Sequence, residues 1–120
     1  MNNMQTLLKH MFIHMLRIKM FHFQCPRYGQ HKISDVYYES FNSKFDKFFE
    51  VAQGVYKKLK MTEIKLPSFD TCPENIDSHL DNFILLLKTL DNIIDNKELL
   101  TIRDDMVNDV SQFKYLLTFS

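Results

Sequence analysis

The chain has 120 residues, 45% of them hydrophobic, and a chain of this length is expected to form one domain with a real core. Lys plus Arg and Asp plus Glu each number 15, so the formal net charge is zero, which argues against a protein that coats DNA. Only 2 Gly and 3 Pro occur. Few turns and long uninterrupted segments predict a helical protein.

Residues 1–24 are predicted to form the first helix. Its apolar positions follow the helical period: Leu7, Leu8, Met11, Phe12, Met15, Ile18 and Met20. Charged and histidine side chains interrupt the apolar run, so the segment is neither a signal peptide nor a membrane span. His10 and His14 are four residues apart but have no nearby acid, so both are expected at the surface or at the edge of the core.

A break follows at 25–30, because Pro26 disfavours helix at Cys25 and Gly29 permits a positive φ. A second helix is predicted from about residue 31 to 60, with Gly54 too weak a signal to end it. Its core stripe is aromatic and aliphatic: Phe41, Phe45, Phe48, Ala52, Val55 and Leu59.

Residues 61–72 are predicted to be a loop, and Pro73 is typical of a first helical position. A third helix is expected over 73–91, with His79 at the surface. Residues 92–96 form a turn, and a fourth helix covers 97–117. Three acids of the fourth helix are expected to face water: Asp104, Asp105 and Asp109.

Four amphipathic segments predict an all-α fold, an antiparallel four-helix bundle in which the 61–72 link could cross over. No Glu is followed three residues later by His, which excludes the usual di-iron site within one chain. The sequence also lacks a phosphate-binding Gly loop and a zinc CxxC motif. Cys25 and Cys72 are too few for a disulfide framework, so both are expected to be reduced thiols in the cytoplasm.

The second predicted helix carries one chemically suggestive stripe. His31 and Asp35 are four residues apart, as are Asp46 and Glu50, and the four side chains fall within an arc of about 100°. His31 and Asp46 are separated by about 22 Å of helix, whereas a metal–ligand bond is only about 2 Å long. A two-fold axis near Ser40–Phe41 would bring the two halves together from two copies and form two equal sites.

His22 lies just before the break, so it is expected at the same end of the bundle as His31. Aromatic-flanked His22, a loop, His31-x-x-x-Asp35 and then Asp46-x-x-x-Glu50 resemble the ferroxidase signature of the Dps-type mini-ferritins. In that family iron is bound between two-fold-related subunits, by histidines and an acid of one and by Asp plus Glu of the other.

The resemblance implies a ferritin-like bundle whose metal ligands are His22, His31, Asp35, Asp46 and Glu50. It further implies that iron is oxidised by peroxide or oxygen and stored inside a closed homo-oligomer of twelve chains. Phe23 stands where the family usually has Trp, and the basic tail that some members use on DNA is missing. Residues 101–120 are also similar to small ferritin-like proteins from viruses and phages, which have no established activity.

Two other functions remain open from the sequence. One is a structural protein, such as a virion component, that keeps the bundle but binds no metal. The other is a helical interaction module whose aromatic stripe binds a partner helix. The expected location is the cytoplasm, or the host cytoplasm or virion for a viral protein.

Overall fold

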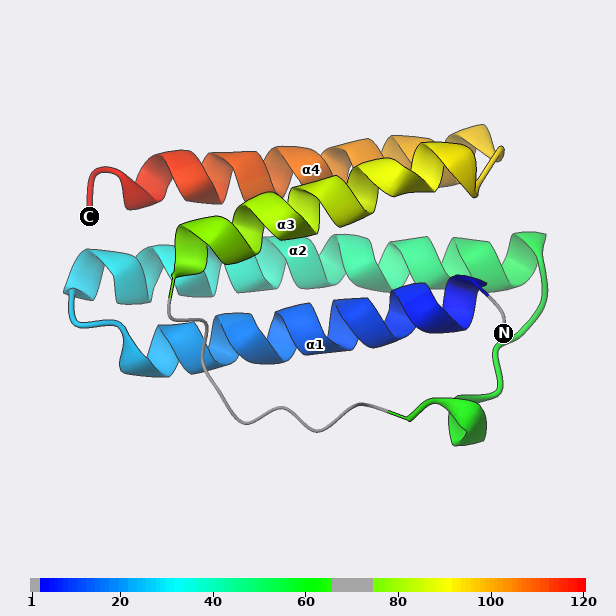
Figure 1. The fold of residues 1–120 in the computed structure, drawn as a ribbon, viewed down its shortest axis with the longest axis horizontal. Coiled ribbons are helices and arrows are strands. Elements are labelled where there is room, and N and C mark those ends of the chain that lie inside the picture. Colours follow the sequence, from blue (N-terminus) through cyan, green and yellow to red (C-terminus); the bar gives the residue numbers. More distant parts are fainter. Residues whose placement is uncertain (1–2, 66–74) are drawn as a thin grey trace.

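A computed structural model describes residues 3–65 and 75–120, and its secondary structure is entirely helical there. The four helices are α1 (Asn3–Gln24), α2 (Tyr28–Val55), α3 (Ile76–Lys88) and α4 (Lys97–Leu117), with short 3-10 helices η1 (Met61–Glu63) and η2 (Thr89–Asn92). The helices pack as an antiparallel bundle, which confirms the predicted all-α class (Figure 1).

The helices form two hairpins, α1 with α2 and α3 with α4, and these join mainly through α2 against α4 (Figure 1). α2 ends at one end of the bundle, whereas α3 begins at the other. α2 and α3 therefore run in the same direction, with the end of α2 and the start of α3 at opposite ends of the bundle. This agrees with the crossover that the sequence allowed.

The core is formed by one apolar face of each helix. Its largest fully buried side chains include Phe41 and Phe48 of α2 and Phe113 of α4. Tyr37 stacks on Phe113 with ring centroids 4.5 Å apart and an interplanar angle of 7°, which joins the two most closely packed helices. Among the described residues, three polar side chains are also buried: His14, Ser34 and Arg103.

α2 differs from its predicted bounds at both ends. It begins at Tyr28, because Arg27 is already the extended residue before the first turn. It ends at Val55, so the prediction that helix continues past Gly54 to about residue 60 is wrong. Gly is among the poorest helix formers, and Gly54 is exposed with no atom within 4 Å of where a Cβ would lie, so no packing offsets that weakness.

Gly29 has a different role from the one expected. No glycine of the described residues has a positive φ, and Gly29 lies within the first turn of α2. A Cβ at this position would lie 3.1 Å from the Cβ of Ser120. Gly29 therefore allows the chain end to approach α2, where Arg27 Nη1 donates to the Ser120 carbonyl at 2.9 Å.

The predicted third helix divides into α3 and η2, while Pro73 and Cys72 lie outside the described residues. Asn75 caps α3 by accepting the Ser78 N–H at 3.1 Å. Asn96 caps α4 in the same way, and the predicted bounds of 97–117 are confirmed. These caps satisfy backbone donors that have no partner within the helix.

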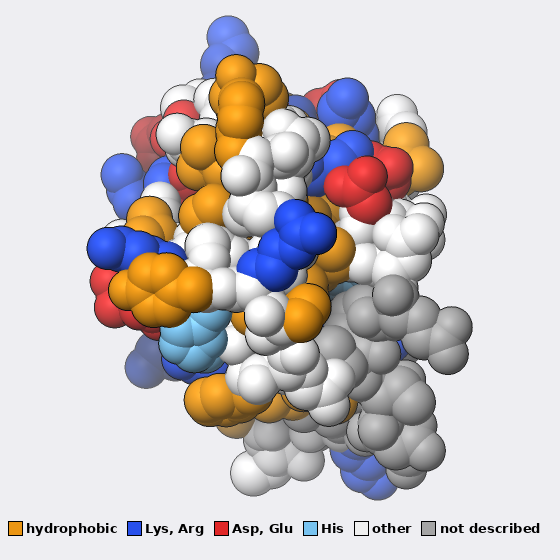
Figure 2. Space-filling model, turned by 90° about the vertical axis from the view of Figure 1, so that its left-hand side faces the viewer, with side chains coloured by type: hydrophobic (Ala, Val, Ile, Leu, Met, Phe, Trp, Pro, Cys, Tyr) orange, Lys and Arg blue, Asp and Glu red, His pale blue; other side chains and the backbone are white. Residues whose placement is uncertain are grey.

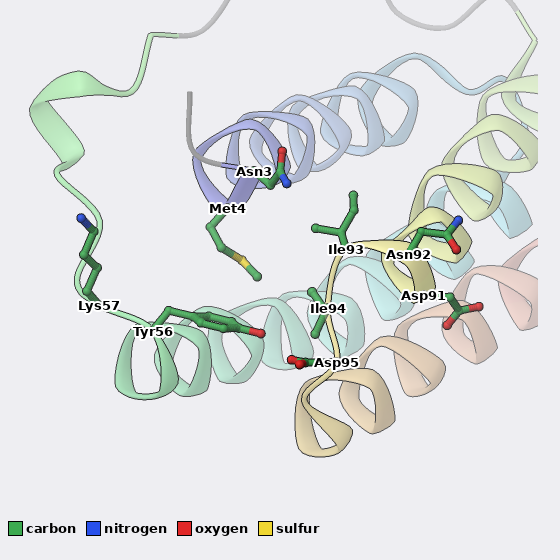
Figure 3. Close-up of a pocket in the computed structure, with 9 residues that line it drawn as sticks. All are labelled: Asn3, Met4, Tyr56, Lys57, Asp91, Asn92, Ile93, Ile94 and Asp95. Carbon is green, nitrogen blue, oxygen red and sulfur yellow. The ribbon is translucent and has the colours of Figure 1, made fainter.

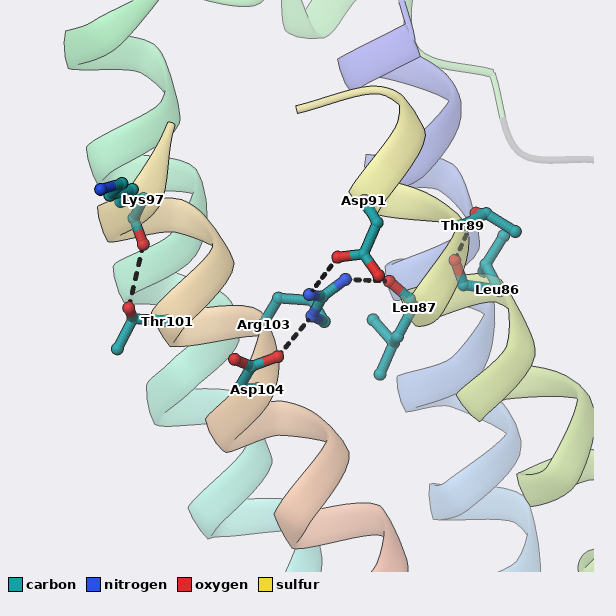
Figure 4. A network of polar contacts seen from close by, with 8 residues as sticks. All are labelled: Leu86, Leu87, Thr89, Asp91, Lys97, Thr101, Arg103 and Asp104. Atoms are coloured by element: carbon teal, nitrogen blue, oxygen red, sulfur yellow. Dashed lines mark hydrogen bonds and ion pairs between the residues drawn. The ribbon is translucent and has the colours of Figure 1, made fainter. Parts of the chain in front are cut away.

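Arg103 of α4 forms a polar link to both α3 and η2 (Figure 4). Its guanidinium donates to the Leu87 carbonyl at 3.0 Å, to Asp91 at 2.6 Å and to Asp104 at 2.9 Å. Arg103 thereby satisfies a carbonyl at the end of α3, where a positive charge is also favoured by the helix dipole.

A second polar link joins α2 to α4. Asp109 accepts from Lys44 at 2.7 Å and from Ser40 at 2.9 Å, and its side chain is 13% exposed. The expectation that Asp109 faces water is therefore wrong, whereas Asp104 and Asp105 are exposed as expected. Asp109 lies on the side of α4 that packs against α2, where Lys44 neutralises its charge.

Candidate functional site

The structure brings His22 and His31 together. The two residues lie in the last turn of α1 and the first turn of α2, on either side of the three-residue break. Their rings stack with centroids 3.9 Å apart and an interplanar angle of 19°. His22 is half-buried and His31 is exposed. The expectation that both histidines lie at the same end of the bundle is confirmed, and the structure adds that their rings are in contact.

Backbone carbonyls fix the orientation of both rings. His31 Nδ1 lies 2.8 Å from the His22 carbonyl, and His22 Nδ1 lies 2.9 Å from the His31 carbonyl. A carbonyl only accepts, so each Nδ1 carries the proton and each Nε2 keeps a lone pair. Ser34 supports the arrangement by donating its hydroxyl to the His31 carbonyl at 2.9 Å. Metal-binding histidines are commonly held through the second ring nitrogen in this way.

The predicted acids lie on the outer side of α2. Asp35, Asp46 and Glu50 are exposed, and no ion pair found among the described residues includes them. In this part of one chain, no three His, Cys, Asp or Glu side chains are placed to hold one metal ion. The single chain therefore brings the two histidines together but leaves Asp46 and Glu50 far along the helix.

A mostly apolar groove of about 350 Å³ lies between α1 and α2. It is lined by Phe12, Met15, Leu16, Tyr38, Asn42 and Phe45. Leu16 is 44% exposed, and Asn42 precedes Asp46 by one helical turn. The groove therefore runs beside the acidic stripe. Seen from the end where α1 turns into α2, the surface also shows histidine beside hydrophobic side chains (Figure 2).

A second histidine cluster lies inside the bundle. His14 of α1 is 1% exposed and contacts two polar groups, the Tyr37 hydroxyl at 2.7 Å from Nε2 and His79 Nε2 at 2.9 Å from Nδ1. Its ring stacks on Phe83 with centroids 3.7 Å apart. His14 was expected at the surface or at the edge of the core, and His79 at the surface. Both expectations are wrong, because His14 is buried and His79 is half-buried against it.

Burial and a nearby cation keep both imidazoles neutral. Burial, the His79 ring and Arg17 together lower the pKa of His14 well below its usual value. Burial and then Arg17 lower the pKa of His79 from 6.5 to about 4. Burial, followed by the charge of Asp109, raises the pKa of Tyr37 well above its usual value. At neutral pH the cluster is therefore uncharged.

Helical spacing in the sequence indicates this cluster, although histidine is a polar residue and was therefore expected nearer the surface. His14 continues the apolar series Leu7, Met11 and Ile18 at helical spacing, and His79 precedes Phe83 by one turn. Position along the apolar stripe was therefore a better guide to burial than the polarity of the side chain.

A pocket of about 630 Å³ lies at the end of the bundle where α1 begins, opposite the end that holds the His22–His31 pair (Figure 3). Its walls come from the start of α1, the end of α2 and the segment before α4. Tyr56 and Ile93 line it beside Asp95, while Asp91 is already paired with Arg103. It contains none of the predicted ligands.

Residues 22–117, most of the chain, match DUF5856, a family of unknown function. The chain belongs to this family. The matched region contains all five predicted metal ligands and begins at His22. No curated protein and no solved structure gives a match, so the resemblance to mini-ferritins depends on the residues themselves. None of the helices in the described parts of the chain has the length and apolar character to cross a membrane.

Proposed function

We propose that this member of DUF5856 forms a two-fold dimer that binds iron between its subunits and promotes its oxidation, as a Dps-like mini-ferritin. The observation that carries the proposal is the His22–His31 pair. Both rings are held through Nδ1 by backbone carbonyls and keep an Nε2 lone pair at one end of an acidic stripe.

The direction of the helices supports a ferritin-like arrangement. Among four-helix bundles, ferritin-like folds have one long crossover, which makes the two helices that it joins run the same way. α2 and α3 have this relation, and each belongs to a tight antiparallel hairpin (Figure 1). A simple up-and-down bundle would instead have α2 and α3 antiparallel.

A second copy of α2 can supply the missing ligands, as the positions of the residues along α2 show. If two α2 helices pair antiparallel about the level of Ser40–Phe41, His31 lies opposite Glu50 and Asp35 lies opposite Asp46. Both pairings come from the same axis, and each dimer gains two equal sites. The groove beside this stripe exposes Leu16, which offers apolar surface for the subunit contact.

The donor atoms suit iron as the cargo. Two neutral imidazole nitrogens and three carboxylates form a mixed N/O set that suits Fe(II), and carboxylates stabilise the higher charge of Fe(III). The His22 and His31 rings are stacked in nearly parallel planes, so their in-plane Nε2 lone pairs do not converge on one point.

The test is anaerobic titration of the purified protein with Fe(II), followed by peroxide, with Fe(III) absorbance as the readout. Parent protein should bind about one or two Fe(II) per chain and oxidise them rapidly. Asp46→Asn should lose both properties. Asp105→Asn is the matched control, because Asp105 is an exposed acid on α4. Equal binding and oxidation by parent and Asp46→Asn would contradict the assigned ligands.

A mixing experiment tests whether the ligands come from two chains. His31→Ala and Asp46→Ala chains should each bind poorly alone, but a mixed dimer has one unmutated site and should recover part of the binding. Absence of recovery in dimers verified to be mixed would refute sharing between subunits. An iron-free dimer would favour a structural role, such as that of a virion component, and an iron-free monomer would favour an interaction module.

A further inference from the structure

A chain of two hydrogen bonds leads from Tyr37, in the core of the bundle, toward the protein surface. The Tyr37 hydroxyl lies 2.7 Å from His14 Nε2, and His14 Nδ1 lies 2.9 Å from His79 Nε2. Tyr37 is 5% exposed and His14 is 1% exposed, whereas His79 is half-buried and lines a pocket between α1 and α3. None of these three residues is assigned to iron.

The phenol is the donor at the inner end of this chain. In the described part of the protein, the hydrogen bond found for the Tyr37 hydroxyl is the one to His14 Nε2, and a buried O–H without an acceptor would be unfavourable. Tyr37 therefore donates to His14. Neutral His14 then carries its own proton on Nδ1 and donates it to His79 Nε2, so neutral His79 carries its proton on Nδ1.

This arrangement suits one-electron oxidation of the phenol. A phenol that loses an electron becomes a strong acid, so its oxidation is fastest where a base already accepts its hydrogen bond. His14 Nε2 is such a base, held at hydrogen-bond distance before the electron leaves. Tyr115 is 62% exposed and would have to release its proton to water, which is a weaker base than imidazole.

The packing around Tyr37 would protect the oxidised ring. Tyr37 stacks on Phe113 with ring centroids 4.5 Å apart, and the Phe41 centroid lies 5.6 Å away. The pocket that Tyr37 lines between α2 and α4 is about 110 Å³, which admits a few water-sized molecules but not the surface of another protein. Phenoxyl radicals are lost chiefly by coupling to one another, so a radical on Tyr37 should outlast one on an exposed tyrosine.

We propose that Tyr37 is a redox-active tyrosine, which gives one electron to a strong one-electron oxidant while its phenolic proton passes to His14. The oxidant belongs to the class of hydroxyl radical or of a high-potential metal complex, and it is reduced by one electron. The O–H bond of Tyr37 breaks, an N–H bond forms at His14 Nε2, and Tyr37 remains as a neutral phenoxyl radical.

The two histidines then remove the positive charge from the core, where burial disfavours it. His14 passes its Nδ1 proton to His79 Nε2, and His79 releases its own Nδ1 proton to solvent. Both hydrogen bonds persist with donor and acceptor exchanged, so His14 Nε2–H now donates to the phenoxyl oxygen. A one-electron reductant and one proton from solvent restore the starting state. This activity needs neither the His22–His31 pair nor iron.

The experiment uses metal-free protein and ruthenium tris-bipyridine, oxidised by a light flash in the presence of a sacrificial electron acceptor. Electron paramagnetic resonance should detect a persistent tyrosyl radical in the parent, coupled to one proton that exchanges in heavy water, which is the proton on His14 Nε2. Tyr37→Phe keeps the ring but should lose the persistent signal. Tyr115→Phe is the matched control and should keep it, because Tyr115 is exposed.

His14→Gln tests the proton acceptor. The amide can still accept from Tyr37 and donate to His79, which favours a normal fold, but it is not a base. Oxidation of Tyr37 should become about a hundredfold slower, and the persistent signal should nearly vanish. A persistent signal of parental strength in Tyr37→Phe or in His14→Gln would overturn the proposal, as would its absence from the parent. Iron is absent throughout, so the outcome is independent of the proposed ferroxidase function.

Discussion

Acid should destabilise this protein through the buried histidine cluster. The folded chain keeps His79 neutral with a pKa of about 4, whereas the usual value is 6.5. Between these values the unfolded chain binds more protons than the folded chain, so the free energy of unfolding falls as the pH falls. The contribution is fully present above pH 6.5 and is lost as the pH approaches 4.

The size of the effect follows from the pKa difference. A shift of one unit corresponds to about 1.4 kcal/mol, so the full difference for His79 would be roughly 3 kcal/mol. His79 is half-buried, and solvent screening reduces its share to about 1–2 kcal/mol between pH 7 and pH 5. His14 contributes in the same direction, because burial, the His79 ring and Arg17 lower its pKa too.

Urea unfolding of parent and His79→Gln at several pH values measures this contribution. Gln still offers an oxygen to accept from His14 Nδ1 but does not titrate. The variant should therefore lose about 1–2 kcal/mol less than the parent between pH 7 and pH 5. His10→Gln is the matched control, because His10 is an exposed histidine of α1. Parallel pH profiles for parent and His79→Gln would refute the reasoning.

Three further changes test the packing and the polar links of the bundle. Arg103→Met should lower the free energy of unfolding, measured with urea, by about 2–3 kcal/mol, because it leaves the Leu87 carbonyl and Asp91 without their donor. A loss no larger than that caused by substituting an exposed residue would contradict a stabilising role for Arg103. Phe48→Ala should cost about 3–5 kcal/mol as a fully buried ring is removed, whereas Phe119→Ala, 70% exposed, should change stability little in the same assay. Asp109→Asn should lower the free energy of unfolding by about 1 kcal/mol. Backbone amides that exchange slowly where α2 meets α4 should then exchange hydrogen faster. Unchanged exchange rates would show that the Lys44 contact is dispensable.

The fold was largely predictable because the helix signals are local and agree with one another. The last helix has a strong period, an Asn cap and no internal breaker, and its bounds of 97–117 match the structure. Gly54 was harder, because whether a weak helix former ends a helix depends on packing around it, and none occurs there. Packing between helices is a property of the whole chain and is not visible in a local pattern.

The two histidine clusters show what sequence spacing can and cannot provide. His22 and His31 were expected at the same end of the bundle, because a short break joins the two helices that carry them, and the structure places their rings there in contact. His14 and His79 are 65 residues apart, and their contact depends on how α3 is placed against α1. Even so, the helical period places His14 on the buried face. Its burial could therefore be predicted from the sequence, whereas its contact with His79 could not.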